Sequence, residues 1–128
     1  MLNILLIDDS SFFLKLAGMQ FVPPTYSLDT ETSGSAGLEK ALNSQYDLVI
    51  TDLNLPDLNG LELIRKLHAH NQDLPIILNT TKDSLEALNI ADLDSKVYLC
   101  DKQLTTLVAR VGAIMAQQKR NRKNKTDA

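Results

Sequence analysis

The chain has 128 residues, a length that suits one domain of ordinary size. Its apolar fraction of 44% is enough to build a core, and no stretch reaches the roughly 18–20 apolar residues that span a membrane. The net charge is −3 and it is uneven: the first 118 residues hold eight basic and 15 acidic residues, and the last ten hold five basic residues and one acid. An acidic body argues against a nucleic-acid partner, since a duplex-binding face needs a basic patch.

The two ends of the chain and its single cysteine bear on location and domain limits. The start, MLNILLIDD, has no basic region ahead of its apolar run, so a signal peptide is not expected. Cys100 is the only cysteine and cannot form an internal disulfide, so the cytoplasm is the simplest location. We expect one domain over residues 1–118, followed by a basic, disordered tail over residues 119–128.

Short apolar runs recur along the chain and predict five strands. The predicted strands are 3–7, 26–32, 48–51, 76–78 and 97–100. Runs without polar residues, such as NILLI and LVIT, are typical of strands covered on both faces. The run 26–32 alternates and is polar, so we expect it at an edge of the sheet.

Segments with helical spacing of apolar residues separate these strands. They begin at Ser10 or Ser11, near Ser35, near Gly60, at Asp83 or Ser84, and at Thr105 or Thr106, and the fourth is expected to end near Leu93. Alternation of strands and helices predicts an α/β fold, a parallel sheet with helices on both faces. The first helix carries an apolar excess, including Phe12, Met19 and Phe21, which forms a docking surface or packs beneath the next loop.

Polar side chains follow four of the five predicted strands. Asp8 and Asp9 follow the first strand, Asp52 the third, Thr80 the fourth, and Lys102 lies just beyond the fifth. Ligands of parallel α/β folds bind beyond the carboxyl ends of the strands, where these side chains would meet. Each residue alone has an ordinary explanation, as a helix cap or a solvated side chain; the convergence of all of them favours a functional site.

This set of side chains suits phosphoryl transfer to a carboxylate. Three carboxylates repel one another and call for a cation, and Mg²⁺ prefers hard oxygen ligands. Lys102 would supply a fixed positive charge and Thr80 a hydroxyl donor, beside Asp52 as the nucleophile.

The same residues resemble the receiver domain of two-component response regulators over about residues 1–117. The block DLVITDLNLPDLNG has the family's spacing of acceptor Asp52, Pro56 and Gly60. The pair Asp8-Asp9 matches the family's acidic pair. The segment PIILNTT, Lys102 and the helix-opening Gly34 match as well.

The resemblance implies a doubly wound, flavodoxin-like (βα)5 fold with a five-stranded parallel sheet of strand order 2-1-3-4-5. It implies that Asp52 is the phosphoacceptor, with Thr80 and Lys102 on the phosphoryl oxygens. Mg²⁺ would be held by Asp9, Asp52 and the main-chain carbonyl of Asn54, with Asp8 acting through a bound water. The phosphodonor would be a histidine kinase or a histidine phosphotransfer protein, and the output another protein.

The chain departs from the family pattern in two places. Gln103 follows Lys102 where the family usually has proline, so we expect a trans peptide bond there and a rebuilt loop. The family's switch aromatic stands three residues before the lysine; here that residue is Leu99, and Tyr98 precedes it. Asn54 and Lys82 occupy positions that tune phosphate lifetime in the family.

We therefore expect a single-domain response regulator that is not an enzyme in the usual sense, although it promotes its own phosphorylation and dephosphorylation. One alternative is a degenerate receiver, a binding module that is never phosphorylated. Another is a cofactor binder or phosphatase on the same fold, but DDSSFF is no phosphate loop, and Asn54 stands where a phosphatase of the dehalogenase type needs an acid. The chain could also be a fragment of a longer regulator.

Overall fold

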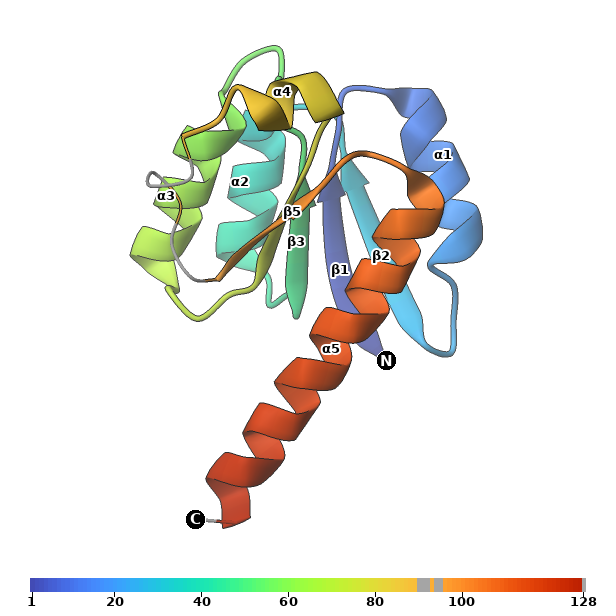
Figure 1. The fold of residues 1–128 in the computed structure, drawn as a ribbon, viewed down its shortest axis with the longest axis vertical. Helices are drawn as coiled ribbons and strands as arrows, with labels where there is room; N and C mark the ends of the chain where they lie inside the picture. The colour runs from blue at the N-terminus through green and yellow to red at the C-terminus, as the bar shows by residue number, and fades with distance from the viewer. Residues whose placement is uncertain (90–92, 94–95, 128) are drawn as a thin grey trace.

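The computed structural model describes residues 1–89, 93 and 96–127, which form one sheet with helices on both faces (Figure 1). All neighbouring strands are parallel, and their order is β2-β1-β3-β4-β5. The strands are β1 Leu2–Ile7, β2 Tyr26–Glu31, β3 Leu48–Thr51, β4 Ile76–Asn79 and β5 Val97–Cys100. The predicted α/β class, the edge position of β2 and the strand order are confirmed.

The helices form a layer on each face of the sheet. They are α1 Ser11–Gln20, α2 Gly34–Asn43, α3 Gly60–His70, α4 Lys82–Glu86 and α5 Leu104–Asp127. One core cluster unites one face of the sheet with α1 and α5, and a second unites the other face with α2 and α3.

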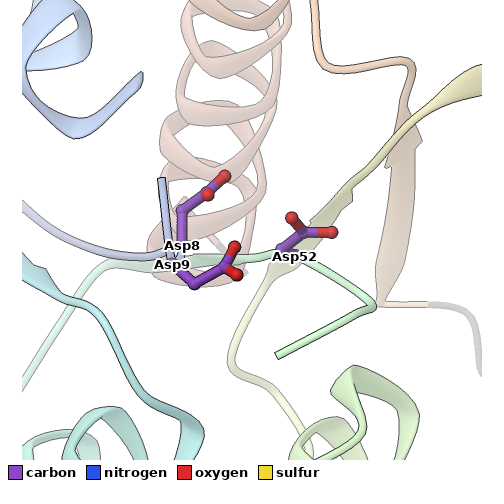
Figure 2. Close-up of side chains that lie close together, drawn as sticks. All are labelled: Asp8, Asp9 and Asp52. Atoms are coloured by element: carbon purple, nitrogen blue, oxygen red, sulfur yellow. The ribbon is translucent and has the colours of Figure 1, made fainter. Parts of the chain in front are cut away.

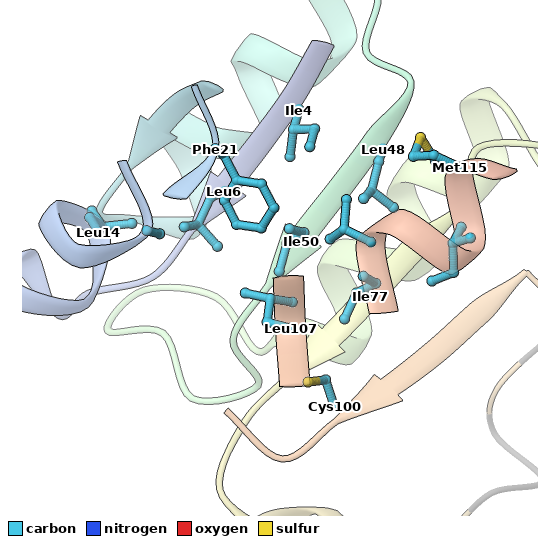
Figure 3. Packing of buried hydrophobic residues seen from close by; sticks show 13 residues of the cluster. Ile4, Leu6, Leu14, Phe21, Leu48, Ile50, Ile77, Cys100, Leu107 and Met115 are labelled. Carbon is cyan, nitrogen blue, oxygen red and sulfur yellow. The ribbon is translucent and has the colours of Figure 1, made fainter. Parts of the chain in front are cut away.

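Strand β1 shows why its sequence is a continuous apolar run. Ile4 and Leu6 face the cluster beneath α1 and α5, whereas Leu5 and Ile7 face the opposite cluster. All four are fully buried, and each contributes about 1.5–3 kcal/mol of transfer free energy. Figure 3 shows Ile4 and Leu6 packed with other members of the first cluster. The strand and its apolar run both end at Ile7, directly before Asp8.

The apolar excess of α1 divides between core and surface. Phe21 is buried and packs edge-to-face against Tyr26, with ring centroids 5.3 Å apart. Phe12 and Met19 are 72% and 68% exposed. Packing beneath the following loop therefore holds for Phe21, whereas Phe12 and Met19 remain on the surface. A docking role for these two side chains stays a prediction.

Ser10 caps α1 as predicted, and α2 begins near its predicted start but after a different serine, Ser33. The predicted starts of the last two helices are wrong. The Ser10 hydroxyl accepts a hydrogen bond from the Phe13 N–H at 3.2 Å. Thr81, not Asp83 or Ser84, caps α4, accepting from the Ser84 N–H at 3.3 Å.

Helix α5 begins before both of its predicted caps. The Leu107 N–H donates to the Gln103 carbonyl at 2.8 Å, so Thr105 and Thr106 lie inside the first turn. The partly buried Leu104 packs against the core cluster at this point and brings the helix start forward.

The extents of α4 and α5 also differ from the sequence prediction. Helix α4 ends at Glu86 and buries none of its residues, so it lacks the apolar face that would extend it; Leu93 lies outside a helix. Residues 90–92 and 94–95 of that prediction lie outside the described residues. Helix α5 continues to Asp127 through the segment expected as a disordered tail, which is rich in the good helix formers Lys and Arg. The domain limit at residue 118 stays a prediction.

Candidate functional site

Three carboxylates meet at the carboxyl edge of the sheet. Asp8 and Asp9 directly follow β1, and Asp52 directly follows the neighbouring strand β3 (Figure 2). Each offers an oxygen within 4.8 Å of the others. Asp8 and Asp52 are buried, whereas Asp9 is exposed. The predicted acidic cluster therefore exists as a compact group that is open to solvent on the Asp9 side.

Lys102 supplies the positive charge of this cluster. Its ammonium nitrogen lies 2.8 Å from Asp52 Oδ2 and 2.9 Å from Asp8 Oδ2. Burial alone would lower the pKa of Lys102, but its hydrogen bonds to Asp52 and Asp8 outweigh burial and raise that pKa, so the side chain stays charged. With three carboxylates and one ammonium group, two negative charges remain uncompensated, a balance that suits a divalent cation.

Asp8 is the most deeply buried member of the cluster. Burial raises its pKa, although the Ser10 N–H donates to Asp8 Oδ1 at 2.8 Å and Lys102 opposes the shift; the nearby Asp52 charge raises the pKa further. A carboxylate that is buried beside a second negative charge is stabilised by any added positive charge. The oxygen donors, their spacing and the excess negative charge thus fit Mg²⁺.

The loop after β5 reaches the site by an unusual backbone conformation at Lys102. Its φ is +64°, in the left-handed region that non-glycine residues seldom adopt. The following bond to Gln103 is trans, as the absence of proline predicted, because the only cis bond among the described residues joins Pro23 and Pro24. The Lys102 ammonium also lies 5.5 Å from the centre of the Phe13 ring. The altered loop therefore still delivers the lysine to the carboxylates.

Thr80 and Asn54 lie at the same edge of the sheet. Thr80 is buried directly after β4, and its N–H donates to the Cys100 carbonyl at 3.1 Å. The Asn54 N–H donates to Asp52 Oδ1 at 3.3 Å, and its side-chain amide donates to Ser84 Oγ at 3.2 Å. This last bond connects the acidic loop to the first turn of α4, a link that the sequence reading did not include.

The two candidates for the switch position lie on opposite faces of the sheet. Tyr98 packs against the cluster beneath α1 and α5. Leu99 packs against the other cluster, which also includes Leu88, just after α4. Successive residues of β5 point to opposite faces of the sheet, so only one of the two can face the side of α4. That residue is Leu99. Lys82 is exposed at the first position of α4.

Gly60 accounts for the spacing of the motif after Asp52. A Cβ atom at this position would lie 2.4 Å from the Asp52 carbonyl oxygen and 2.8 Å from the Leu53 Cα. The Gly60 N–H donates to the Leu53 carbonyl at 2.8 Å, closing the loop between β3 and α3. Only glycine permits this approach, so its position is fixed by packing against the backbone of Asp52.

Asp57 and Asn79 were not recognised from the sequence as important. The Asp57 carboxylate accepts hydrogen bonds from the N–H groups of Gly34 and Ser35, more than 20 residues away in the chain. Asn79 is buried at the end of β4, and within the described part of the chain neither of its side-chain polar atoms has a hydrogen-bond partner. No local pattern signals either feature, because both depend on tertiary packing.

Two hollows of about 470 and 390 Å³ open at the opposite, amino-terminal edge of the sheet, beside Asp47 and Asn71. They lie away from the carboxylates, and a metal ion held by side-chain oxygens needs no deep cavity. None of the helices in the described ranges is long and apolar enough to cross a bilayer.

The sequence that places these acids, the threonine and the lysine at one sheet edge matches a known family. The profile of the response regulator receiver domain matches residues 4–106. The chain belongs to this receiver family. Its membership places the chain among the proteins of two-component systems, as the sequence motifs predicted.

Curated relatives of this receiver include longer response regulators. The chain is 36% identical over 120 residues to response regulator ArlR of Staphylococcus haemolyticus and to ArlR of Staphylococcus aureus, covering 92% of this chain and 54% of each relative. The receiver therefore spans about half the length of the curated relatives it matches.

Solved structures share the receiver fold. A CheY-like receiver domain from Methanospirillum hungatei has a TM-score of 0.77 at 19% identity, covering 94% of this chain and 98% of that one. CheY4 of Vibrio cholerae has a TM-score of 0.77 at 24% identity, covering 89% and 98%. Response regulator TrrA of Thermotoga maritima, solved with Mg²⁺ and BeF, has a TM-score of 0.67 at 30% identity, covering 78% and 86%.

Proposed function

We propose that this receiver accepts a phosphoryl group on Asp52 in a Mg²⁺-dependent reaction and thereby changes its protein-binding surface. The observation that carries the proposal is the ion-paired cluster of Asp8, Asp52 and Lys102, with Asp9 beside it. Two negative charges stay uncompensated beside this ion pair, a balance that favours a metal-binding receiver over a degenerate one. The donor would be a histidine kinase or a histidine phosphotransfer protein, the class of donor that supplies receivers.

The residues proposed to hold Mg²⁺ are Asp8, Asp9, Asp52 and the main-chain carbonyl of Asn54. Their fit rests on the carboxylate oxygens within 4.8 Å of one another and on the excess of negative charge. The ion would neutralise charge on the phosphoryl oxygens and the carboxylates. The TrrA relative, 30% identical, was solved with Mg²⁺ and BeF, which supports the same assignment here.

The chain's own groups would carry the transfer as follows. A carboxylate oxygen of Asp52 forms a bond to phosphorus while the P–N bond to the donor histidine breaks, and that electron pair stays on the imidazole nitrogen. Lys102, which is 2.8 Å from Asp52 now, would turn to a phosphoryl oxygen and offset its charge. The Thr80 hydroxyl would donate to a second phosphoryl oxygen. Positioning and charge neutralisation are the main demands of such a step.

Phosphorylation would act on the surface formed by α4, β5 and α5. A shift of Thr80 toward the phosphoryl group would pull on β4, and Leu99 on the neighbouring strand faces the cluster next to α4. We propose Leu99 rather than Tyr98 as the switch position for this reason. Asn54 and Lys82, at the mouth of the site, are proposed to set the lifetime of the phosphoryl group.

The proposed partners are proteins. Phe12 and Met19 on α1 offer an exposed apolar contact for the phosphodonor, and the output would be a downstream protein target rather than nucleic acid. The receiver would promote its own phosphorylation and dephosphorylation without being an enzyme in the usual sense. The cytoplasm stays the proposed location, in keeping with the free thiol of Cys100.

Amide NMR spectra with Mg²⁺ and beryllofluoride, an analogue of the phosphoryl group, test the proposal. Wild type and the control Asp73→Asn are expected to shift at Thr80, Lys82 and Leu99, and Asp52→Asn is expected to show no such shifts. An unchanged wild-type spectrum at saturating Mg²⁺ would overturn the proposal and favour the degenerate receiver.

A further inference from the structure

The loop between β3 and α3, residues 52–59, is anchored unevenly. Its leucines pack against the core, with Leu53 buried and Leu55 and Leu58 partly buried, whereas Asn54 and Asp57 are exposed. Exposed loop positions are mobile unless something ties the loop down. Yet it carries Asn54, whose main-chain carbonyl is a proposed ligand of Mg²⁺, so its position bears directly on the site.

The tip of this loop is tied to the first turn of α2. Asp57 Oδ1 accepts from the Gly34 N–H at 2.8 Å, and Asp57 Oδ2 accepts from the Ser35 N–H at 2.9 Å. The Ser35 hydroxyl donates to the same Oδ2. The first N–H groups of a helix have no partner within it and carry partial positive charge, so a carboxylate suits them well. Asp57 therefore shares the capping of α2 with Ser33, whose hydroxyl accepts a hydrogen bond from the Ala36 N–H.

The fit of the loop against α2 is close as well as polar. A Cβ atom at Gly34 would lie 2.7 Å from the Leu58 Cβ and 3.3 Å from Asp57 Oδ1. The helix start therefore has no room for a side chain, and the loop rests on its backbone. Hydrogen bonds and packing act at the same point and independently indicate one fixed position for the tip.

The tip is coupled to the acidic end of the loop through short connections. Asn54 and Asn59 pair across the loop as an isolated antiparallel bridge. The Asn54 N–H donates to Asp52 Oδ1, and the Gly60 N–H closes the loop on the Leu53 carbonyl. A displacement at the tip is therefore passed to Asn54 and to the carboxylate of Asp52.

We infer that Asp57 is a positioning residue: by holding the tip of the loop on α2, it fixes the Asn54 carbonyl for the metal. This inference rests on the proposed function, because it concerns the proposed Mg²⁺ site. Asp57 is not a member of the carboxylate cluster, and it would act only through the loop. Residues that orient metal ligands without touching the ion typically change metal affinity about 10–100-fold when replaced.

Titration calorimetry with MgCl2 alone tests the inference on the full chain. Asp57→Ala is expected to weaken Mg²⁺ binding about tenfold. Asp57→Asn, which keeps an oxygen acceptor, is expected to recover part of the affinity, and Ser35→Ala, which leaves both backbone bonds, should lose less. The matched control Asp73→Ala removes an exposed aspartate elsewhere and should bind as wild type does.

A destabilised variant separates positioning from a merely structural role. Met115→Ala leaves a cavity in the core beneath α5, away from the loop, and should lower the free energy of unfolding in urea while leaving Mg²⁺ affinity unchanged. If wild type and Asp57→Ala bind Mg²⁺ equally, the inference is wrong and the proposed function stands. If wild type itself does not bind Mg²⁺, the proposed metal site fails and the inference fails with it.

Discussion

The ammonium nitrogen of Lys102 lies 2.8 Å from Oδ2 of Asp52, although 50 residues separate the two in the chain. Two features of the backbone place them there. Asp52 directly follows β3, and Lys102 lies in the loop after β5, where its backbone is left-handed. The same nitrogen also reaches Asp8. One ammonium group therefore pairs with two buried carboxylates. With Asp9, the site keeps an excess of negative charge.

Replacing Lys102 by methionine should destabilise the metal-free protein. Removing one member of a buried ion pair leaves the other charge unpaired, which costs about 3 kcal/mol in the free energy of unfolding. Added Mg²⁺ should recover part of this loss, because the ion replaces the missing positive charge. Urea unfolding of wild type and Lys102→Met, with and without Mg²⁺, measures both effects.

The control for this experiment is Lys40→Met. Lys40 pairs with Glu31 at 3.4 Å on the surface, where such a pair contributes about 1 kcal/mol or less. Its loss should be small and should not respond to Mg²⁺. If the two substitutions lowered the free energy of unfolding equally, Lys102 would not stabilise the buried carboxylates as proposed.

Two glycines should respond in opposite ways to alanine. Gly60→Ala puts a Cβ against the Asp52 backbone and should lower the free energy of unfolding by about 1–3 kcal/mol. Gly18→Ala, at an exposed position of α1 with nothing near the added carbon, should raise it by about 0.5–1 kcal/mol. Thermal or urea unfolding of both variants measures these changes. If Gly60→Ala were as stable as wild type, the loop after Asp52 would be able to move away from the added carbon.

Asn79→Leu should stabilise the protein. The Asn79 side chain is 1% exposed, and both of its polar atoms lack a partner among the described residues. An unsatisfied buried group costs about 1–3 kcal/mol, which an apolar side chain of similar size avoids. Asn79→Ala should gain less, because it leaves a cavity. A loss of stability in Asn79→Leu, measured in urea, would mean that the amide holds a bound water.

The hydrogen bonds from Gly34 and Ser35 to the Asp57 carboxylate should make the free energy of unfolding depend on pH. The Ser35 hydroxyl, followed by the Ser35 and Gly34 N–H groups, lowers the pKa of Asp57 to about 2, against roughly 3.9 in an unfolded chain. Because the folded pKa is the lower one, this contribution to stability is full above about pH 5 and is lost as the pH falls toward 2. The stability difference between wild type and Asp57→Asn should therefore shrink between pH 5 and pH 3 in urea unfolding. If the difference in free energy of unfolding between wild type and Asp57→Asn stayed constant over this pH range, these hydrogen bonds would not stabilise the folded state.

The sheet and most of the site could be predicted from the sequence, because they follow from local patterns. Apolar runs such as 48–51 end at the polar residues that form the site, and a parallel sheet brings such ends together. The trans bond after Lys102 also followed directly from the absence of proline.

The remainder depends on contacts that sequence patterns do not report. The predicted start of α5 was wrong because Leu104, one residue before Thr105, packs against the core cluster and is already helical. The cap of α2 by Asp57 spans 22 and 23 residues, so no spacing rule detects it. Tyr98 and Leu99 could be ranked only once the structure showed which cluster each contacts.

Phosphorylation of Asp52 is tested most directly by the intact mass of the protein after incubation with acetyl phosphate and Mg²⁺. We predict a gain of one phosphoryl group in wild type, lost on omission of Mg²⁺ and absent in Asp52→Asn, with Asp73→Asn behaving as wild type. A gain of the same mass in Asp52→Asn, or a gain that does not need Mg²⁺, would contradict the assignment of Asp52 as the phosphoacceptor of a metal-dependent receiver.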